Sequence, residues 1–125
     1  MNSATLARSA YSQVAAITPT DRSVEYKAFA QITSGLASAR AETGPAAFAR
    51  LSEAVNLNRR LWSILAADVA SDDNQLPDET RAQILSLASF TRQHSEKILR
   101  READADVLIE INSSIMRGLR GQDQE

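Results

Sequence analysis

Apolar residues recur along this chain at spacings of three and four, which is typical of amphipathic helices. The strongest run covers about residues 45–70, where Leu57, Leu61 and Ile64 widen the apolar stripe to about half of the helix circumference. A stripe of this width needs more than one packing neighbour, so we expect this helix to lie at the centre of a bundle. The stripe itself consists of Phe48, Leu51, Val55, Asn58, Trp62, Leu65 and Val69.

Proline, glycine and asparagine residues separate four further helical segments from this central one. Two precede it, over about residues 4–16 and 20–42. The fourth helix starts at Pro77, where a missing backbone donor costs nothing, and the fifth starts near Asp104 and ends at Gly118 to Gly121. The buried faces that we predict are Val24, Ala28, Ile32, Leu36 and Ala39 in the second helix, Ile84, Leu87, Ala88, Thr91, His94 and Ile98 in the fourth, and Leu108, Ile111, Ile115 and Leu119 in the fifth.

The predicted fold class is therefore all-α, a single-domain bundle of about five helices. A length of 125 residues is too short for a second hydrophobic core. Abundant alanine and an aromatic share of only 5% favour helices that pack closely through small side chains. Residues 1–125 form one domain in this prediction, with 1–8 as an extension and 122–125 as a flexible polar tail.

Composition and charge exclude several classes of function. The chain has no cysteine, which rules out disulfides and thiolate metal sites and fits a reducing compartment. No apolar run is long enough to span a bilayer, and the N-terminus lacks the basic and apolar regions of a secretion signal, so we expect a cytoplasmic protein without membrane contact. A net charge of −2 argues against broad electrostatic affinity for nucleic acid.

The residues that could support catalysis or bind a metal do not form a known arrangement. The acidic segment from Asp72 to Pro77 lacks the ligand spacing of a calcium loop. His94 is the only histidine, and its neighbours on the helix do not supply the carboxylate partner that acid–base catalysis needs. We therefore predict a structural, half-buried His94 that bonds to a backbone or polar group, with no enzyme activity, no metal and no cofactor.

Arg59 and Arg60 differ from the other arginines because they lie in the middle of a helix beside Trp62, the only tryptophan. Arginine and tryptophan are enriched at protein interfaces, which favours a surface that binds a partner. The alternative is that both arginines are solvated or paired within the chain. Four others lie near predicted helix C-termini, where cations stabilise the helix dipole: Arg100, Arg101, Arg117 and Arg120.

Short motifs from about Ser9 to Gly121 form an ordered set. The central ones are Asn58-Arg59-Arg60-Leu61-Trp62, Asp68-Val69, and Asn74-Gln75-Leu76-Pro77 with Arg81 after it. Around them lie Ala10-Tyr11-Ser12-Gln13-Val14, Arg22-Ser23-Val24-Glu25, Ala28-Phe29-Ala30-Gln31-Ile32-Thr33, Leu87-Ala88-Ser89-Phe90 before His94, Leu108-Ile109-Glu110-Ile111-Asn112, and Gly118-Leu119. In this order and spacing the motifs resemble the FlaF family of flagellar biosynthesis regulators in flagellated alphaproteobacteria. The motif residues to which we assign a structural role are Asn58, Leu76, Pro77, His94 and Asn112.

The resemblance implies a protein that binds flagellin as a secretion chaperone and acts with FlbT, the partner regulator of flagellin translation. Unassembled flagellin has long amphipathic terminal helices, and a helical protein could cover one of them in an apolar groove. We predict this groove between the third and fifth helices, with Arg59 and Arg60 at its rim. Its predicted apolar lining is Trp62, Leu108, Ile111, Ile115 and Leu119.

Part of the central motif should nevertheless be buried. Asn58 and Trp62 fall on the stripe of the central helix, so we expect Asn58 to bond inside the bundle and Trp62 to fill its centre.

Two other interpretations stay open at this point. One is an RNA-binding regulator of flagellin mRNA that uses the arginines directly, and steep salt dependence would distinguish it from a helix-in-groove complex. The other is a homodimer that covers the surplus apolar surface. A small helical enzyme is less well supported, because no reactive arrangement is present.

Overall fold

The computed structural model describes the backbone of residues 19–124 and the side chains of residues 26–117, and every regular element in this part of the chain is an α-helix. The helices are α2 (Pro19–Ala41), α3 (Ala47–Ala70), α4 (Asp78–Leu99) and α5 (Asp106–Gln124). The all-α fold class is confirmed. The prediction of about five helices does not match these four, and the first predicted helix, over 4–16, lies outside the described residues.

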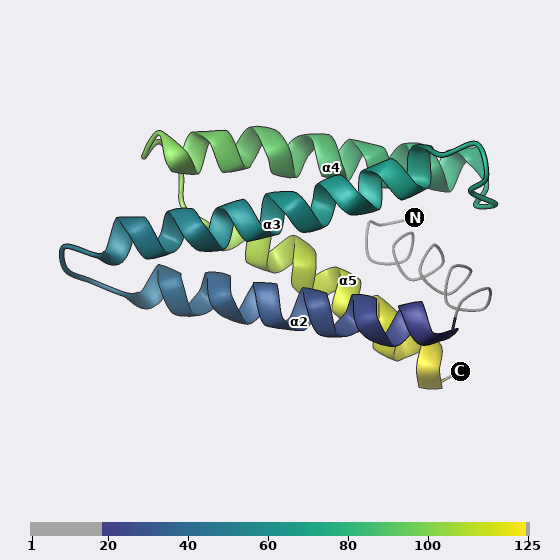
Figure 1. Ribbon diagram of the computed structural model, residues 1–125, viewed down its shortest axis with the longest axis horizontal. Helices are drawn as coiled ribbons and strands as arrows, with labels where there is room; N and C mark the ends of the chain where they lie inside the picture. The colour runs from purple at the N-terminus through teal and green to yellow at the C-terminus, as the bar shows by residue number, and fades with distance from the viewer. Residues whose placement is uncertain (1–18, 125) are drawn as a thin grey trace.

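The middle of the bundle is occupied by α3 (Figure 1). α2 and α4 lie along its two sides, and α5 crosses behind α2 and α3 at an angle. α3 packs closely against both α2 and α4, and α5 packs against α2. The central position that we predicted for residues 45–70 is therefore confirmed, because the wide apolar stripe of this helix serves two neighbours at once.

Side chains build the turn between α3 and α4 by bonding to its backbone. The Oδ1 of Asn74 accepts a hydrogen bond from the backbone N–H of Leu76 at 3.0 Å, the local bond that makes asparagine common in turns. Arg81 donates from Nε to the Val69 carbonyl at 2.8 Å and from a terminal nitrogen to the Ser71 carbonyl at 3.2 Å. Carbonyls at a helix C-terminus have no partner within the helix, so Arg81 satisfies the end of α3 from the first turns of α4.

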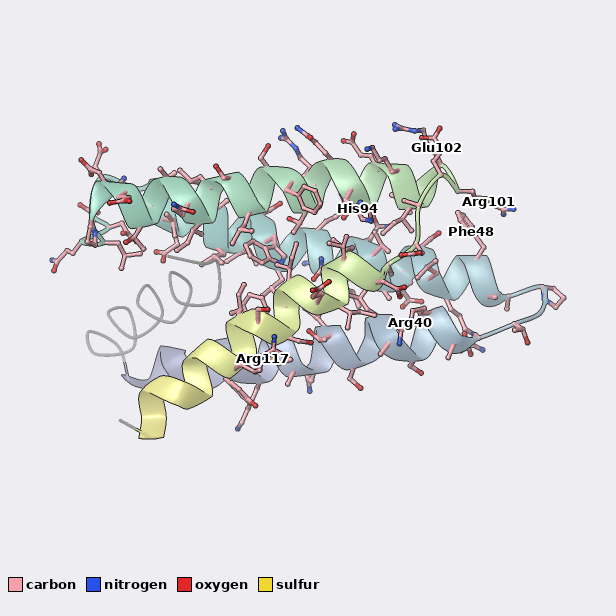
Figure 2. All side chains as sticks on the ribbon, turned by 180° about the vertical axis from the view of Figure 1, so that it is seen from behind. Arg40, Phe48, His94, Arg101, Glu102 and Arg117 are labelled. Carbon is pink, nitrogen blue, oxygen red and sulfur yellow. The ribbon has the colours of Figure 1, made fainter. Side chains whose placement is uncertain are left out.

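The end of α4 contains the one non-glycine residue with positive φ in the described part of the chain, Arg101 at 63°. The Arg101 N–H donates to the Ile98 carbonyl at 2.9 Å, and the Glu102 N–H donates to the Lys97 carbonyl at 2.8 Å. These two bonds form a Schellman motif, which usually has glycine at the left-handed position. The Arg101 guanidinium lies 4.0 Å from the ring centroid of Phe48, so a cation–π contact accompanies the unusual backbone (Figure 2).

α5 is longer than predicted. Its backbone stays helical to Gln124, whereas the sequence predicted an end at Gly118 to Gly121 and a flexible tail over 122–125. Glycine inside a helix costs only about 1 kcal/mol relative to alanine, so it does not end a helix unless the backbone turns to positive φ.

Two apolar clusters fill the interior of the bundle. The first contains Phe29, Trp62, Leu65, Val69, Leu76, Ile84 and Ile115. The second contains Leu36, Ala39, Ala54, Val55, Ile98, Ala105 and Leu108. The buried face of α2 differs from the prediction, since Phe29 is buried while Ala28 and Ile32 are only half-buried. The reason is that α2 packs against α5 as well as α3, and the Phe29 ring meets the Trp62 ring edge-on at a centroid distance of 5.9 Å.

A layer of buried polar residues lies between the two clusters, and we call it the polar layer. Each described helix contributes to it: Thr33 from α2, Asn58 from α3, Thr91 and Ser95 from α4, and Asn112 from α5. Along each helix these residues stand between members of the two clusters; on α3, for example, Asn58 lies between Val55 and Trp62. The interior is therefore divided along its length into apolar, polar and apolar sections.

Candidate functional site

Hydrogen bonds within the polar layer join α3 to α5. The Nε1–H of Trp62 donates to Oδ1 of Asn112 at 3.0 Å, and Nδ2 of Asn112 donates to Oδ1 of Asn58 at 2.8 Å. Asn58 and Asn112 are fully buried, and Trp62 is 2% exposed. The prediction that Asn58 bonds inside the bundle and that Trp62 fills its centre is confirmed.

The polar layer is not completely satisfied. Among the described residues, Nδ2 of Asn58 and Oγ1 of Thr33 are buried side-chain atoms without a hydrogen-bond partner. Burying an unpartnered polar group costs about 1–3 kcal/mol, so the layer adds less stability than an apolar section of the same size. Its bonds are directional, however, and they oppose any sliding of α5 along α3.

His94 also has a structural contact, as predicted. It is half-buried, and its Nε2 lies 2.8 Å from the backbone carbonyl of Asp104, just before α5. A carbonyl can only accept, so Nε2 carries the proton in this contact. The imidazole stacks on Phe90 with a centroid distance of 5.7 Å. His94 thus fastens α4 to the start of α5.

Leu76 and Pro77 complete the set of residues to which the sequence assigned a structural role. Leu76 is buried in the first cluster, and Pro77 is the residue immediately before α4, with φ of −56°. Together they anchor the turn and set where α4 begins.

The predicted groove between the third and fifth helices is wrong in its position. Trp62, Leu108 and Ile115 are 2%, 0% and 2% exposed, so they belong to the interior and present almost no surface. The physical reason is that α5 packs on α2 and crosses α3 at an angle, with Asn112 bonded to Asn58 and Trp62, so these side chains face inward. The side chain of Leu119 lies outside those that the structure describes. A partner-binding role for these residues stays a prediction without support from their exposure.

Ile111 borders a groove that opens between α4 and α5. We call it the α4–α5 groove, and its cavity volume is about 270 Å³. Phe90, one helical turn beyond Leu87 on α4, is 44% exposed. Most of the lining is apolar, with polar groups from Glu110 and Ser114. The lining residues are Leu87, Val107, Glu110, Ile111, Ser114 and Ile115.

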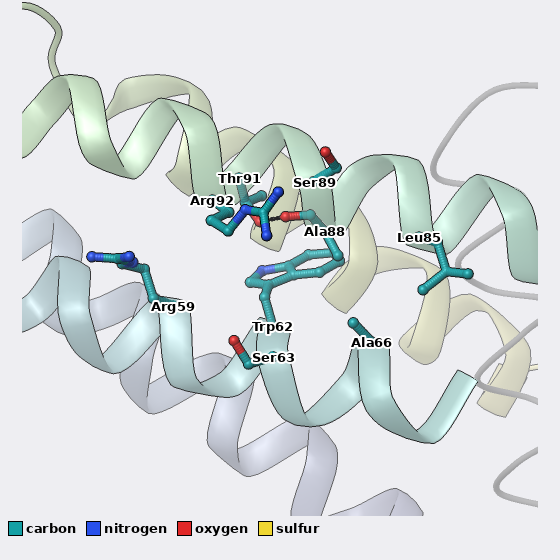
Figure 3. Close-up of a pocket in the computed structure, with 9 residues that line it drawn as sticks. All are labelled: Arg59, Trp62, Ser63, Ala66, Leu85, Ala88, Ser89, Thr91 and Arg92. Atoms are coloured by element: carbon teal, nitrogen blue, oxygen red, sulfur yellow. Dashed lines mark hydrogen bonds between the residues drawn. The ribbon is translucent and has the colours of Figure 1, made fainter. Parts of the chain in front are cut away.

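A second hollow lies between α3 and α4, and we call it the arginine pocket (Figure 3). The Trp62 indole lies between the two helices, Arg59 extends from α3, and Arg92 extends from α4. Sequence patterns identified Arg59 but missed Arg92, because only the packing of α3 on α4 brings the two together. The lining residues are Arg59, Trp62, Ser63, Ala66, Leu85, Ala88, Ser89, Thr91 and Arg92.

The outer surface of α3 adds a shallow hollow beside this pocket, and we call it the α3 hollow. It is lined by Asn56, Arg59, Arg60, Ser63 and Ile64. Ile64 is 68% exposed, and Leu57, seven residues earlier, is 45% exposed. Ion pairs among the described residues involve the guanidiniums of Arg40, Arg50, Arg81 and Arg100. Pairing of Arg59 or Arg60 within the chain is therefore not found among the described residues. Solvated arginines and a surface that binds a partner both remain predictions.

Among the described residues, no group of three or more His, Cys, Asp or Glu side chains could hold a metal ion. Among the same residues, no helix has the length and apolar content to cross a membrane.

The fold and its hollows define a class of protein: a small helical bundle with a polar layer inside and two openings between helices, one apolar and one rich in arginine. The chain belongs to the FlaF family, because the family model described as flagellar protein FlaF matches residues 7–119, nearly the whole chain. It is thus a flagellar protein. Comparisons with curated proteins and with solved structures gave no significant match.

Proposed function

We propose that this protein is a cytoplasmic flagellin chaperone that acts with FlbT to couple flagellin synthesis to export and filament assembly. Membership of a flagellar family supports the process in which it acts. The α4–α5 groove is the observation that supports the binding of a flagellin helix. The proposal assigns the protein a binding role without catalysis.

The groove suits one face of an amphipathic helix. A helix that binds in a groove inserts apolar side chains at spacings of three, four and seven residues and leaves its polar face in solvent. Leu87, Val107 and Ile111 are half-buried, so they offer apolar surface without being sealed inside the bundle. The terminal helices of unassembled flagellin have this amphipathic character, and covering them would prevent aggregation.

Co-purification tests the proposal. The protein is co-expressed with flagellin, and the mass of the purified complex gives its stoichiometry. We expect a complex that remains intact at micromolar concentration, and failure to recover one would overturn the chaperone function. The mass of the protein alone shows whether the free form is a homodimer.

Variants locate the binding surface. Ile111→Asp places a charge in the groove and should weaken flagellin binding at least tenfold, because a buried carboxylate would have no partner. Glu110→Lys, at an exposed position on the rim, is a second variant that leaves the core unchanged. Ser38→Asp is the matched control, since Ser38 is exposed on α2 and lines neither the groove nor the hollows on α3. Normal binding by folded Ile111→Asp and Glu110→Lys would place the site elsewhere.

Direct binding to flagellin mRNA is less well supported than binding to flagellin. Sequence-tolerant RNA binding uses aromatic side chains on which bases stack, and Trp62 is almost wholly buried. A titration with single-stranded RNA at low and high salt separates the two functions, because phosphate contacts weaken steeply as salt rises.

A further inference from the structure

The arginine pocket and the α3 hollow share Arg59 and Ser63, so they form one continuous surface, which we call the arginine surface. Arg59, Arg60 and Arg92 lie on it, and none of them takes part in an ion pair among the described residues. Arg59 is half-buried, and no carboxylate among the described residues pairs with its guanidinium. No carboxylate in the described part of the chain therefore lies within ion-pair distance of these three guanidiniums.

We propose that the arginine surface binds an acidic amphipathic helix of a partner protein, with a carboxylate side chain of that helix held by Arg59 and Arg92. A guanidinium presents a planar fork of N–H donors that matches the two oxygens of a carboxylate, and such charge-assisted bonds are stronger than neutral ones. Glutamate or aspartate on the partner would supply the missing negative charge.

The lining of the arginine pocket suits a carboxylate side chain. Its cavity volume is about 250 Å³, and it opens onto the α3 hollow. The floor is apolar where Trp62, Leu85 and Ala88 meet, and this suits the methylene groups of a glutamate. Ser63 and Ser89 add hydroxyl groups that can donate to the same carboxylate.

The exposed face of α3 supplies apolar contacts for the rest of the partner helix. Leu57 and Ile64 are two helical turns apart, and Arg60 lies between them on the same face. This order of apolar, basic and apolar residues is complementary to a helix that carries apolar and acidic residues at the same spacing.

Nucleic acid fits the surface less well than an acidic helix. Phosphates also bind guanidiniums, but Trp62 is too deeply buried to stack on a base.

The only tryptophan of the chain lines the pocket, so its fluorescence reports binding there. The probe is a blocked helical peptide with glutamates and leucines at helical spacing, and the matched peptide has glutamine in place of every glutamate. We expect saturable changes in Trp62 emission with the glutamate peptide and at least tenfold weaker binding of the glutamine peptide. Binding should also weaken between about 50 mM and about 300 mM salt.

The variant Arg59→Glu/Arg92→Glu should bind the glutamate peptide at least tenfold more weakly than the wild type. Lys97→Glu is the matched control, because Lys97 is exposed on α4 and lines neither hollow. Equal binding of the two peptides, or unchanged binding by the folded double variant, would overturn the proposal. Arginine-dependent binding of a single-stranded RNA in place of the peptide would overturn it in favour of nucleic acid.

The acidic-helix site rests on the proposed function only because flagellin is the first natural partner to test. The site and the proposed function can fail separately. If the glutamate peptide binds through Arg59 and Arg92 while wild-type protein binds no flagellin, the proposed function is wrong and the acidic-helix site stands. If flagellin binding depends on Ile111 while neither peptide binds, the acidic-helix site is wrong and the proposed function stands.

Discussion

Asn58 and Arg59 are neighbours on α3, yet Asn58 belongs to the interior of the bundle and Arg59 to its surface. Asn58 lies in the polar layer, fully buried and bonded across to Asn112. Arg59 lines the arginine surface, half-buried and without an ion pair among the described residues. A buried polar group without a partner lowers the stability of the fold, whereas a guanidinium that still reaches water can remain unpaired at little cost.

Within this short motif we therefore expect Asn58 to affect stability and Arg59 to affect the proposed binding. Substitutions in the polar layer should change the free energy of unfolding, because they leave buried groups without partners. Substitutions on the arginine surface should change binding and leave the fold almost unaffected.

The largest effect should come from Asn112→Ala. This change removes the two hydrogen bonds that form a ladder from Trp62 through Asn112 to Asn58, and it leaves Nε1 of Trp62 and Oδ1 of Asn58 buried without partners. We expect the free energy of unfolding to fall by about 3 kcal/mol, measured by urea denaturation. Ser113→Ala, at the half-buried neighbouring position, is the control. A loss below about 1 kcal/mol would show that the ladder contributes little.

Trp62→Phe should destabilise the protein by about 2 kcal/mol, since it removes the indole N–H and part of the core volume. A double-mutant cycle with Asn112→Ala isolates the shared bond, and we expect a coupling free energy of about 1 kcal/mol. Strictly additive effects in the cycle would contradict a direct bond between the two side chains.

Arg81→Ala removes an arginine that bonds within the protein, in contrast to Arg59 and Arg92 on the arginine surface. Arg81 holds the carbonyls of Val69 and Ser71, so its loss should cost about 1.5 kcal/mol in thermal or urea unfolding. Arg81→Lys keeps the charge but cannot donate to both carbonyls from the spaced nitrogens of a guanidinium. It should therefore recover less than half of the lost free energy of unfolding. Full recovery by lysine would mean that charge, and not geometry, matters at this turn.

The smallest effect on stability should follow Arg59→Ala and Arg92→Ala. Each should change the free energy of unfolding by less than about 0.5 kcal/mol, because neither side chain has an ion pair to lose among the described residues. A clear destabilisation by either variant would move that arginine from the binding region to the structural one.

Local patterns identified much of the fold. The three-and-four spacing of residues 45–70 located α3 and its central position, and Pro77 marked the start of α4 to within one residue. The same spacing placed Asn58 and Trp62 inside the bundle. These predictions succeeded because helix periodicity depends on near neighbours in the chain.

Other features depended on contacts between distant residues. Periodicity alone could not show that Phe29, and not Ala28, faces the core, because α2 has two packing partners. It also could not show that Leu108 is fully buried while Ile111 borders a groove, since the packing of α5 decides which of its residues stay accessible. For the same reason Arg92 had no signal in the sequence that linked it to Arg59.

The amino-acid sequence by itself determined the helical class, the central helix and the family, because each rests on local spacing or on the order of motifs. Only the tertiary structure decided which distant residues meet the Asn58 to Trp62 motif. The physical reason is that burial depends on where the other helices pack, and that packing joins Asn58 to Asn112 and brings Arg59 and Arg92 to one pocket.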